Sequence, residues 1–195
     1  MFRQINIRIV AVLAAALLIA GCGSLPASQN GNDLSQNVVE TAEGPLPGTL
    51  SNPNPQKTMV ITTYQATKDG MYLVPETHTV PQNEHPAQTA LELLVAGTKN
   101  PELISIVPHG TKVLGVKIKN HIAYADFNSA IVKNNPGGST EEMLLVAAIV
   151  DTLTEFHDIQ KVQILVDGKT VDTINGHMDT SEPLSRSEKI IKKQL

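Results

Sequence analysis

The sequence STEEMLLVAAIVDTLTEF, Ser139 to Phe156, carries the strongest helix signal of the chain. It follows the helix breaker Pro136-Gly137-Gly138, and its start matches a capping box in which Ser139 caps the helix and Glu142 reaches back to it. Met143 to Val150 is apolar all round, so it is either covered on both sides or exposed to a partner. We expect burial within the domain. The stripe that faces the core would be Leu145, Ile149, Leu153 and Phe156.

Strand patterns lie on both sides of this helix. Before it, Val113 to Ile118 and Ile122 to Asp126 are joined by Asn120-His121, which predicts a hairpin. After it, alternating apolar residues are followed by the turn Asp167-Gly168 and a further strand pattern, Val171 to Ile174. The alternating residues are Val162, Ile164 and Val166.

A second helix and a first hairpin are predicted further toward the N-terminus. Met59 to Tyr64 and Met71 to Val80, the latter disturbed by Pro75, flank the turn signal Lys68-Asp69-Gly70. Pro86 can open a helix that Gly97 is placed to end. Its apolar face would comprise Ala87, Ala90, Leu91 and Leu94.

The order of these elements, ββαββαββ, predicts an α+β fold. Helices between strand pairs are natural crossovers within one sheet, so we expect a two-layer sandwich of a mixed β-sheet with two main helices. The domain would span residues 58–195, a length that suffices for one core.

The N-terminus predicts export and lipid attachment. Arg3 and Arg8 precede the apolar run Ile9 to Ala20, so residues 1–21 match a signal peptide. The apolar run itself is too short for a comfortable membrane span. The run ends in Leu18-Ile19-Ala20-Gly21-Cys22, which resembles the lipobox of bacterial lipoproteins and makes Cys22 the expected acylation site. An ordinary signal peptide is the alternative. Gly23, not an aspartate, follows Cys22, which permits outer-membrane sorting in a two-membrane cell.

Residues 22–57 are expected to be a flexible tether. From Gly23 to about Gln56 the chain is rich in Ser, Asn, Gly and Pro and carries no Lys or Arg, so it offers little apolar surface to bury. Removing a leader that contains Arg3 and Arg8 would change the net charge from −4 to −6, which argues against a nucleic-acid partner. Because Cys22 is the only cysteine, lipidation would leave no thiol for a disulfide, a metal or catalysis.

The candidates for catalysis or metal binding are few. Ser129 and Ser139 lack a G-x-S-x-G elbow, and the chain has no phosphate-binding G-x-x-x-x-G-K-[ST] motif. Glu141 and Glu142 point to different sides of a helix and suit its positive end. We therefore expect no catalytic residue and no cofactor.

The histidines have no helical zinc-pair spacing. His157 with Asp158 could bind a metal, but a histidine after a helix is also favoured by the helix dipole. His85 and His121 lie at predicted element boundaries, where solvated turn residues are expected. No metal site is predicted. The six histidines are His78, His85, His109, His121, His157 and His177.

Two surface segments have both a structural and a functional interpretation. Asp69-Gly70 and Asp167-Gly168-Lys169 suit hairpin turns and could also be contacts in an interface. The tail, Ser181 to Leu195, could be a basic docking segment, but a solvated, frayed terminus is the preferred expectation. Its basic residues are Arg186, Lys189, Lys192 and Lys193.

Several stretches, in order along the folded region, resemble the GerMN domain of sporulation and spore-germination proteins. The resemblance implies a non-enzymatic, extracytoplasmic lipoprotein whose fold is similar to ring-building modules of sporulation and secretion complexes. The stretches are DGMYLVPETHTVP (Asp69–Pro81), PAQTALELLVAG (Pro86–Gly97), VPHGTKVLGVKI (Val107–Ile118), IAYADFNS (Ile122–Ser129) and VDTLTEFHDIQKVQILVDGKTVDTINGHMDTSEPLSRSE (Val150–Glu188).

The leading functional hypothesis is a binding or scaffolding domain, held at the membrane through lipid on Cys22, that docks a protein partner or self-associates. A solute- or cell-wall-binding lipoprotein is the alternative and would require a concave polar pocket. A hydrolase would require converging polar groups. A small-molecule ligand and a nucleic acid are not expected as partners.

Overall fold

The computed structural model describes residues 56–192. Within them, β1 (Thr58–Thr67) and β2 (Leu73–Pro81) form a long antiparallel hairpin, followed by helix α1 (Pro86–Ala96). The short β3 (Leu103–Ile104) pairs with the end of β1, which gives a three-stranded sheet in the order β2-β1-β3. The predicted signal peptide, Cys22 and most of the predicted tether lie outside the described residues and remain predictions.

A second sheet is built from the rest of the domain. β4 (Val113–Lys119) and β5 (Ile122–Phe127) form a hairpin, and β6 (Lys161–Val166) pairs in parallel with β5 after helices α2 (Ala130–Lys133) and α3 (Ser139–Leu153). Two-residue strands β7 (Lys169–Thr170) and β8 (Leu184–Ser185) both pair with β6. The described chain then forms a 3₁₀ turn, η1 (Glu188–Ile190).

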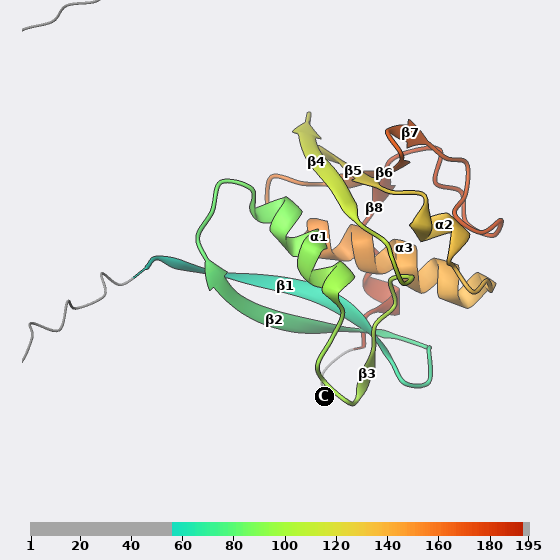
Figure 1. The fold of residues 1–195 in the computed structure, drawn as a ribbon, viewed down its shortest axis with the longest axis horizontal. Helices are drawn as coiled ribbons and strands as arrows, with labels where there is room; N and C mark the ends of the chain where they lie inside the picture. Colours follow the sequence, from blue (N-terminus) through green and yellow to red (C-terminus); the bar gives the residue numbers. More distant parts are fainter. Residues whose placement is uncertain (1–55, 193–195) are drawn as a thin grey trace, which may run out of the picture. The chain divides into compact units, whose positions relative to one another are not determined.

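The predicted α+β class and the order of the main elements are confirmed. The expected single mixed sheet is instead divided into two, because β1 pairs only with β2 and β3. Helices α1 and α3 pack against β1 and also contact the second sheet, α1 through β4 and α3 through β6. Figure 1 shows the two helices between the hairpin and the β4–β5–β6 strands.

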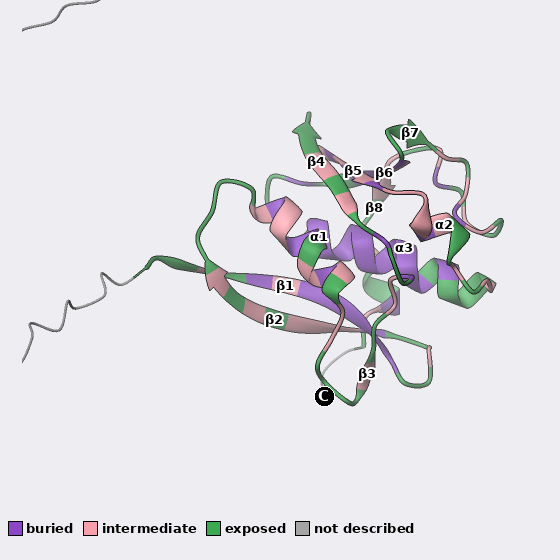
Figure 2. Cartoon of the chain, viewed as in Figure 1, coloured by how far each residue is buried: buried purple, intermediate pink, exposed green. Residues whose placement is uncertain are grey.

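The core confirms the predicted burial of α3. Leu144 to Val150 are all buried, whereas Met143 remains 42% exposed at the start of the helix. Figure 2 shows how burial is concentrated in this helix. The face predicted for α1 is also confirmed, since Ala87, Ala90, Leu91 and Leu94 are its buried residues.

Pro75 does not disrupt the first hairpin. It lies opposite Tyr64, whose backbone N–H points away from β2 and donates to Thr152 Oγ1 at 3.2 Å. Tyr64 and Pro75 therefore form a non-hydrogen-bonded pair of the antiparallel hairpin, in which the backbone nitrogens of both residues point away from the partner strand. The missing N–H of Pro75 thus removes no hydrogen bond between the strands. An outer strand therefore tolerates the proline.

Three local predictions about the second half of the chain differ from the structure. The capping box does not form, because Gly138 is the N-cap, no side chain caps the helix, and Glu142 is buried against another segment. Val171 to Ile174 is not a strand, because the backbone N–H of Ile174 donates to Glu142 and not to a neighbouring strand. The helix also ends at Leu153, before the predicted Phe156.

The C-terminal segment is docked as far as it is described, which corrects the expectation of a frayed tail. β8 pairs with β6, Ile190 is buried, and the backbone N–H of Lys192 donates to Leu73 O at 2.8 Å. Lys193 and the last two residues lie outside the described part.

Candidate functional site: the outer edge of β4

The residues singled out from the sequence are spread over the described domain. His78 bonds to Thr63, His121 Nδ1 lies 3.0 Å from Asp158 O, and His177 Nδ1 lies 3.1 Å from Glu142. Residues 56–192 contain no group of three His, Cys, Asp or Glu side chains that could hold a metal ion. Ser139 lies within the first turn of α3 and not in a nucleophile elbow.

The two predicted hairpin tips are turns. Asp69 Oδ1 accepts a hydrogen bond from the Met71 N–H at 3.1 Å, and its bond to Thr67 is the main reason that the pKa of Asp69 is lowered. Asp167 and Gly168 both have positive φ, and the Gly168 N–H donates to Asp126 Oδ1 at 2.8 Å. Whether these tips also contact a partner stays a prediction.

The sequence did not single out β4 as a site, but this strand has the features of one. It is the outer strand of the second sheet, and among residues 56–192 no strand pairs with its outer side (Figure 1). The pairing with β5 shifts between Val113 and Gly115, and the intervening Leu114 is 53% exposed. The outer side of β4 therefore presents unpaired backbone N–H and C=O groups together with an exposed apolar side chain.

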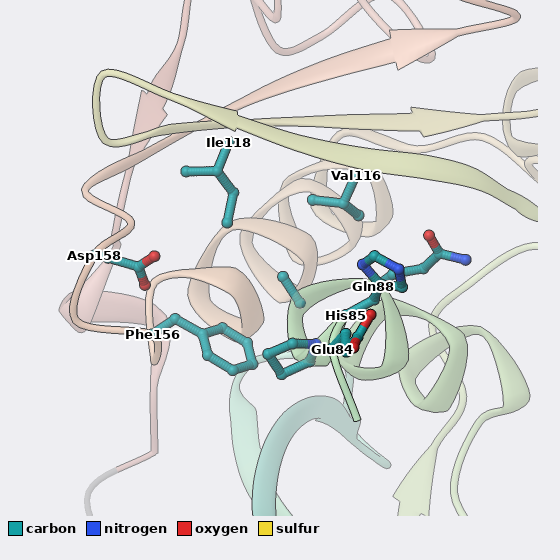
Figure 3. A pocket seen from close by; sticks show the side chains of 9 residues that line it. Glu84, His85, Gln88, Val116, Ile118, Phe156 and Asp158 are labelled. Atoms are coloured by element: carbon teal, nitrogen blue, oxygen red, sulfur yellow. The ribbon is translucent and has the colours of Figure 1, made fainter. Parts of the chain in front are cut away.

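A hollow lies beneath one face of β4. Val116 and Ile118 extend from the strand toward Phe156 and the start of α1, as Figure 3 shows. The hollow has a volume of about 160 Å³, and Ile118 remains 47% exposed although it shares its sheet face with the buried Ala123 and Ala125. Its polar lining comprises Glu84, His85, Gln88 and Asp158.

The structure places His85 and Asp158, which the sequence put at separate element boundaries, on opposite sides of this hollow (Figure 3). Both line this hollow, and both are exposed. His121 contacts only the backbone of Asp158 through its ring, and no third ligand completes a metal site in residues 56–192.

The opposite face of β4 is basic. The strand alternation places Lys117 and Lys119 on that face, and the register aligns Lys119 with Ile122 of β5 and then with Lys161 of β6. All three lysines are exposed, and none forms an ion pair with the described residues. β4 therefore separates an apolar hollow from a patch of positive charge.

Two polar networks that sequence reasoning missed hold the domain together. Burial disfavours the charged form of Glu142, but hydrogen bonds from Thr173, Asn175 and His177 outweigh this effect and lower its pKa to about 2. In the sequence, Glu142 is an acidic residue at the start of an apolar run, a pattern that predicts a helix cap. Its partners follow more than 30 residues later, beyond the reach of local patterns.

The second network is centred on Arg186, one of the basic residues of the tail that could form a docking segment according to the sequence. Its guanidinium contacts Glu155 at 2.9 Å and Glu188 at 2.6 Å, lies 5.2 Å from the centre of the Tyr64 ring, and donates to Asp151 O at 3.0 Å. Burial and the bond to Glu155 outweigh the influence of Arg186 and raise the pKa of Tyr64 to about 12. Arg186 therefore anchors the C-terminal segment to its own domain.

The helices described in residues 56–192 are all too short or too polar to cross a membrane.

The fold and the distributed sequence pattern define a GerMN-type domain, and the comparisons agree. The family model described as "Germane: Sporulation and spore germination" matches residues 54–172, so the chain belongs to the Germane family. The spore germination protein GerM of Bacillus subtilis is 27% identical over 201 residues, which cover 91% of this chain and 54% of that protein. The chain thus spans about half the length of this relative.

Solved structures of the same relative support the fold. The tandem GerMN domains of the sporulation protein GerM from Bacillus subtilis match with a TM-score of 0.58 and 28% identity, over 66% of this chain and 46% of that one. The first GerMN domain of that protein alone matches with a TM-score of 0.56 and 28% identity, over 66% of this chain and 98% of the domain. The predicted family and the predicted α+β fold class are confirmed.

Proposed function

We propose that this protein is an extracytoplasmic lipoprotein, anchored through Cys22, whose GerMN domain binds another protein and does not catalyse a reaction. The names of the family and of its relative, which refer to sporulation and spore germination, support the proposal that this binding serves sporulation, germination or another assembly of the cell envelope. The lipid would fix the domain at the outer face of the cell membrane, or at the outer membrane of a two-membrane cell.

The outer edge of β4 is the observation that carries this proposal. An exposed strand edge can accept an extended segment of a partner, because the backbone groups of the two strands complete each other's hydrogen bonds. Affinity then comes from the backbone, and specificity comes from side chains that alternate between the two faces.

The two faces of β4 define the chemistry of the partner segment. Side chains on one face would meet Val116 and Ile118 over the hollow, whereas side chains on the other face would meet Lys117 and Lys119. A strand that alternates apolar and acidic residues satisfies both requirements. The partner is therefore an extended acidic and apolar segment of another protein. Lysines also discourage nonspecific pairing at sheet edges, so they select against partners that lack the acidic residues.

The test is photocrosslinking in cells that produce the full chain. A photoreactive phenylalanine analogue at Leu114 should capture one partner protein, because this side chain is 53% exposed beside the open edge. The same analogue at Val60, which is 69% exposed on β1, is the matched control and should not capture that partner. Equal capture from both positions, or capture of nothing from Leu114, would overturn the proposed surface.

A charge-reversal test distinguishes specific binding at this surface from nonspecific association. Reversing Lys117 and Lys119 to Glu should reduce the Leu114 crosslink by about tenfold, because charged side chains in an interface set specificity and association rate. Reversing Lys57 and Lys169 changes the net charge equally at other exposed positions and should leave the crosslink intact. A crosslink between two copies of this chain would instead identify self-association, and the proposed acidic partner would then be wrong.

A further inference from the structure

A second hollow lies on the other side of α1, between the end of that helix and β2. It has a volume of about 320 Å³ and is separate from the edge of β4. Two residues of β2 supply its polar side, and the last turn of α1 supplies its apolar side. The lining residues are Glu76, His78, Leu93, Ala96, Gly97 and Lys99.

The wall behind this hollow is a polar face of the first hairpin. The register aligns Thr63 with Glu76, and the strand alternation places Gln65 and His78 on the same face. Thr63 and Gln65 are completely buried, which is unusual for a sheet face packed against a helix. Thr63 Oγ1 lies 2.8 Å from His78 Nε2, so part of this polarity is satisfied internally.

The remaining buried polarity consists of acceptors that lack a donor. Glu76 Oε1 accepts a hydrogen bond from Thr98 Oγ1 at 3.0 Å, but Glu76 Oε2 is buried and has no partner. Gln65 Nε2 donates to Leu94 O at 3.5 Å, and Gln65 Oε1 is buried without a partner. Of the three buried side-chain atoms without partners in residues 56–192, two therefore lie on this one face. A buried acceptor left unpaired costs about 1 to 3 kcal/mol, so the polarity of this face is only partly satisfied within the domain.

The end of α1 adds negative potential at the same place. The helix ends at Ala96 with no basic residue in its last turn, and Gly97 has φ 78° and ψ −171°. The C-terminal end of a helix carries partial negative charge. The carboxylate of Glu76 and the end of α1 thus both favour a cation.

Leu93 and Ala96 give the hollow an apolar side. An alkyl chain that ends in an ammonium group fits a hollow with one apolar and one polar side. Its methylene groups lie along the apolar surface while the ammonium reaches the polar atoms. Lys99 is exposed at the rim and forms no ion pair with the described residues. Lys99 also lines the hollow, so its ammonium can compete for the same carboxylate.

We propose that this hollow is a binding site for an aliphatic primary ammonium group, with Glu76 as its anionic partner and the Leu93–Ala96 side holding the aliphatic stem. From the sequence alone a small-molecule ligand is not expected, and this site does not depend on the partner proposed for β4. The ammonium can belong to a free amine or to a lysine side chain, and both sources present the same chemistry.

The test is titration of the full chain, solubilised in detergent, with defined amines. Nα-acetyl-L-lysine N-methylamide and cadaverine are the probes, and the norleucine analogue of the first compound lacks only the ammonium. Binding is measured by calorimetry and by NMR shifts of the Gly97 and Thr98 amides. Saturable binding of an amine, without binding of the norleucine analogue, is expected. Preference for the capped lysine would indicate a lysine side chain as the natural source, and preference for cadaverine would indicate a free amine.

Variants connect the binding to Glu76. Glu76→Gln keeps the shape of the side chain and should weaken amine binding by about tenfold or more, because a charged hydrogen bond is lost. Glu92→Gln removes the charge of an exposed acid on α1 that does not line the hollow, and it should have no effect. Lys99→Ala should retain or strengthen binding, because it removes a competing ammonium. The proposal is wrong if neither amine shifts the two amides, if Glu76→Gln binds normally, if Lys99→Ala abolishes binding, or if a divalent cation binds in place of the amines.

Discussion

Glu142 Oε1, in the first turn of α3, accepts a 2.6 Å hydrogen bond from the hydroxyl of Thr173, which lies 31 residues further along the chain. The same oxygen accepts the N–H groups of Ile174 and Asn175, and the other oxygen accepts the N–H of His177 at 2.8 Å. One buried carboxylate thus fastens an irregular loop to the central helix.

Glu142→Gln should destabilise the domain by roughly 2 kcal/mol, because the amide replaces one acceptor oxygen with a donor that faces N–H groups. The free energy of unfolding in urea measures this change. Glu141→Gln is the matched control, since Glu141 is the exposed neighbour on the same helix turn. Equal stabilities of the two variants would contradict the role assigned to Glu142.

The stability of the domain should fall in acid through Glu142. Its pKa is about 2 in the folded protein and 4.5 when unperturbed, so the unfolded state binds the proton first. The contribution is complete above about pH 4.5 and is lost as the pH falls toward about 2, and it amounts to about 3 kcal/mol. Urea unfolding between pH 2 and 6 measures it.

Comparison with Glu142→Gln isolates this titration. The pKa of Asp151 is raised by burial, so its contribution to stability is present in acid and is lost as the pH rises through its folded pKa, opposite in sign to that of Glu142. Because both proteins retain Asp151, the difference between their stability curves reports Glu142 alone. A difference that stays constant from pH 2 to 6 would be incompatible with the lowered pKa.

Arg186→Ala should destabilise the domain by about 2 kcal/mol, because it leaves the buried Asp151 without a nearby cation and removes the contacts to Tyr64 and Glu155. Hydrogen exchange at the Ser187 amide, which donates to Asp151 Oδ1 at 2.9 Å, should accelerate in the variant. Lys189→Ala, at an exposed position of the same segment, should change neither quantity. Unchanged exchange at Ser187 would show that Arg186 does not hold the tail.

Cys22→Ala should abolish metabolic labelling with an alkynyl fatty acid and should stop lipid-dependent processing, because the chain has no other cysteine. Labelling followed by gel fluorescence measures the result. Any label retained by the variant would refute lipid attachment at this residue.

Local sequence patterns predicted the elements whose structure depends on near neighbours. Asn120 and His121 both adopt positive φ, at 51° and 62°, which a tight hairpin turn requires. Pro86 begins α1 and Gly97 follows it, as the two residue types favour at the two ends of a helix. The alternation in β6 also placed Val162, Ile164 and Val166 on a buried face.

The candidate site at β4 could be predicted only in part. The alternation of apolar and polar residues predicted the strand itself. Its position at the edge of a sheet depends on which strands pair with it, and local sequence patterns do not specify strand pairing. The exposure of Ile118 likewise depends on α1 and Phe156 leaving a hollow beneath it.

The sequence by itself determined the two main helices, the hairpin turns and the α+β class, because periodicity, turn residues and breakers act within a few residues of the backbone. A resemblance distributed along the folded region identified the family. Only the tertiary structure decided that the strands form two sheets, that Glu142 binds a loop and not its own helix end, and that Arg186 is an internal anchor. These outcomes depend on contacts between residues 31 to 122 positions apart, where burial and hydrogen-bond satisfaction outweigh local preference.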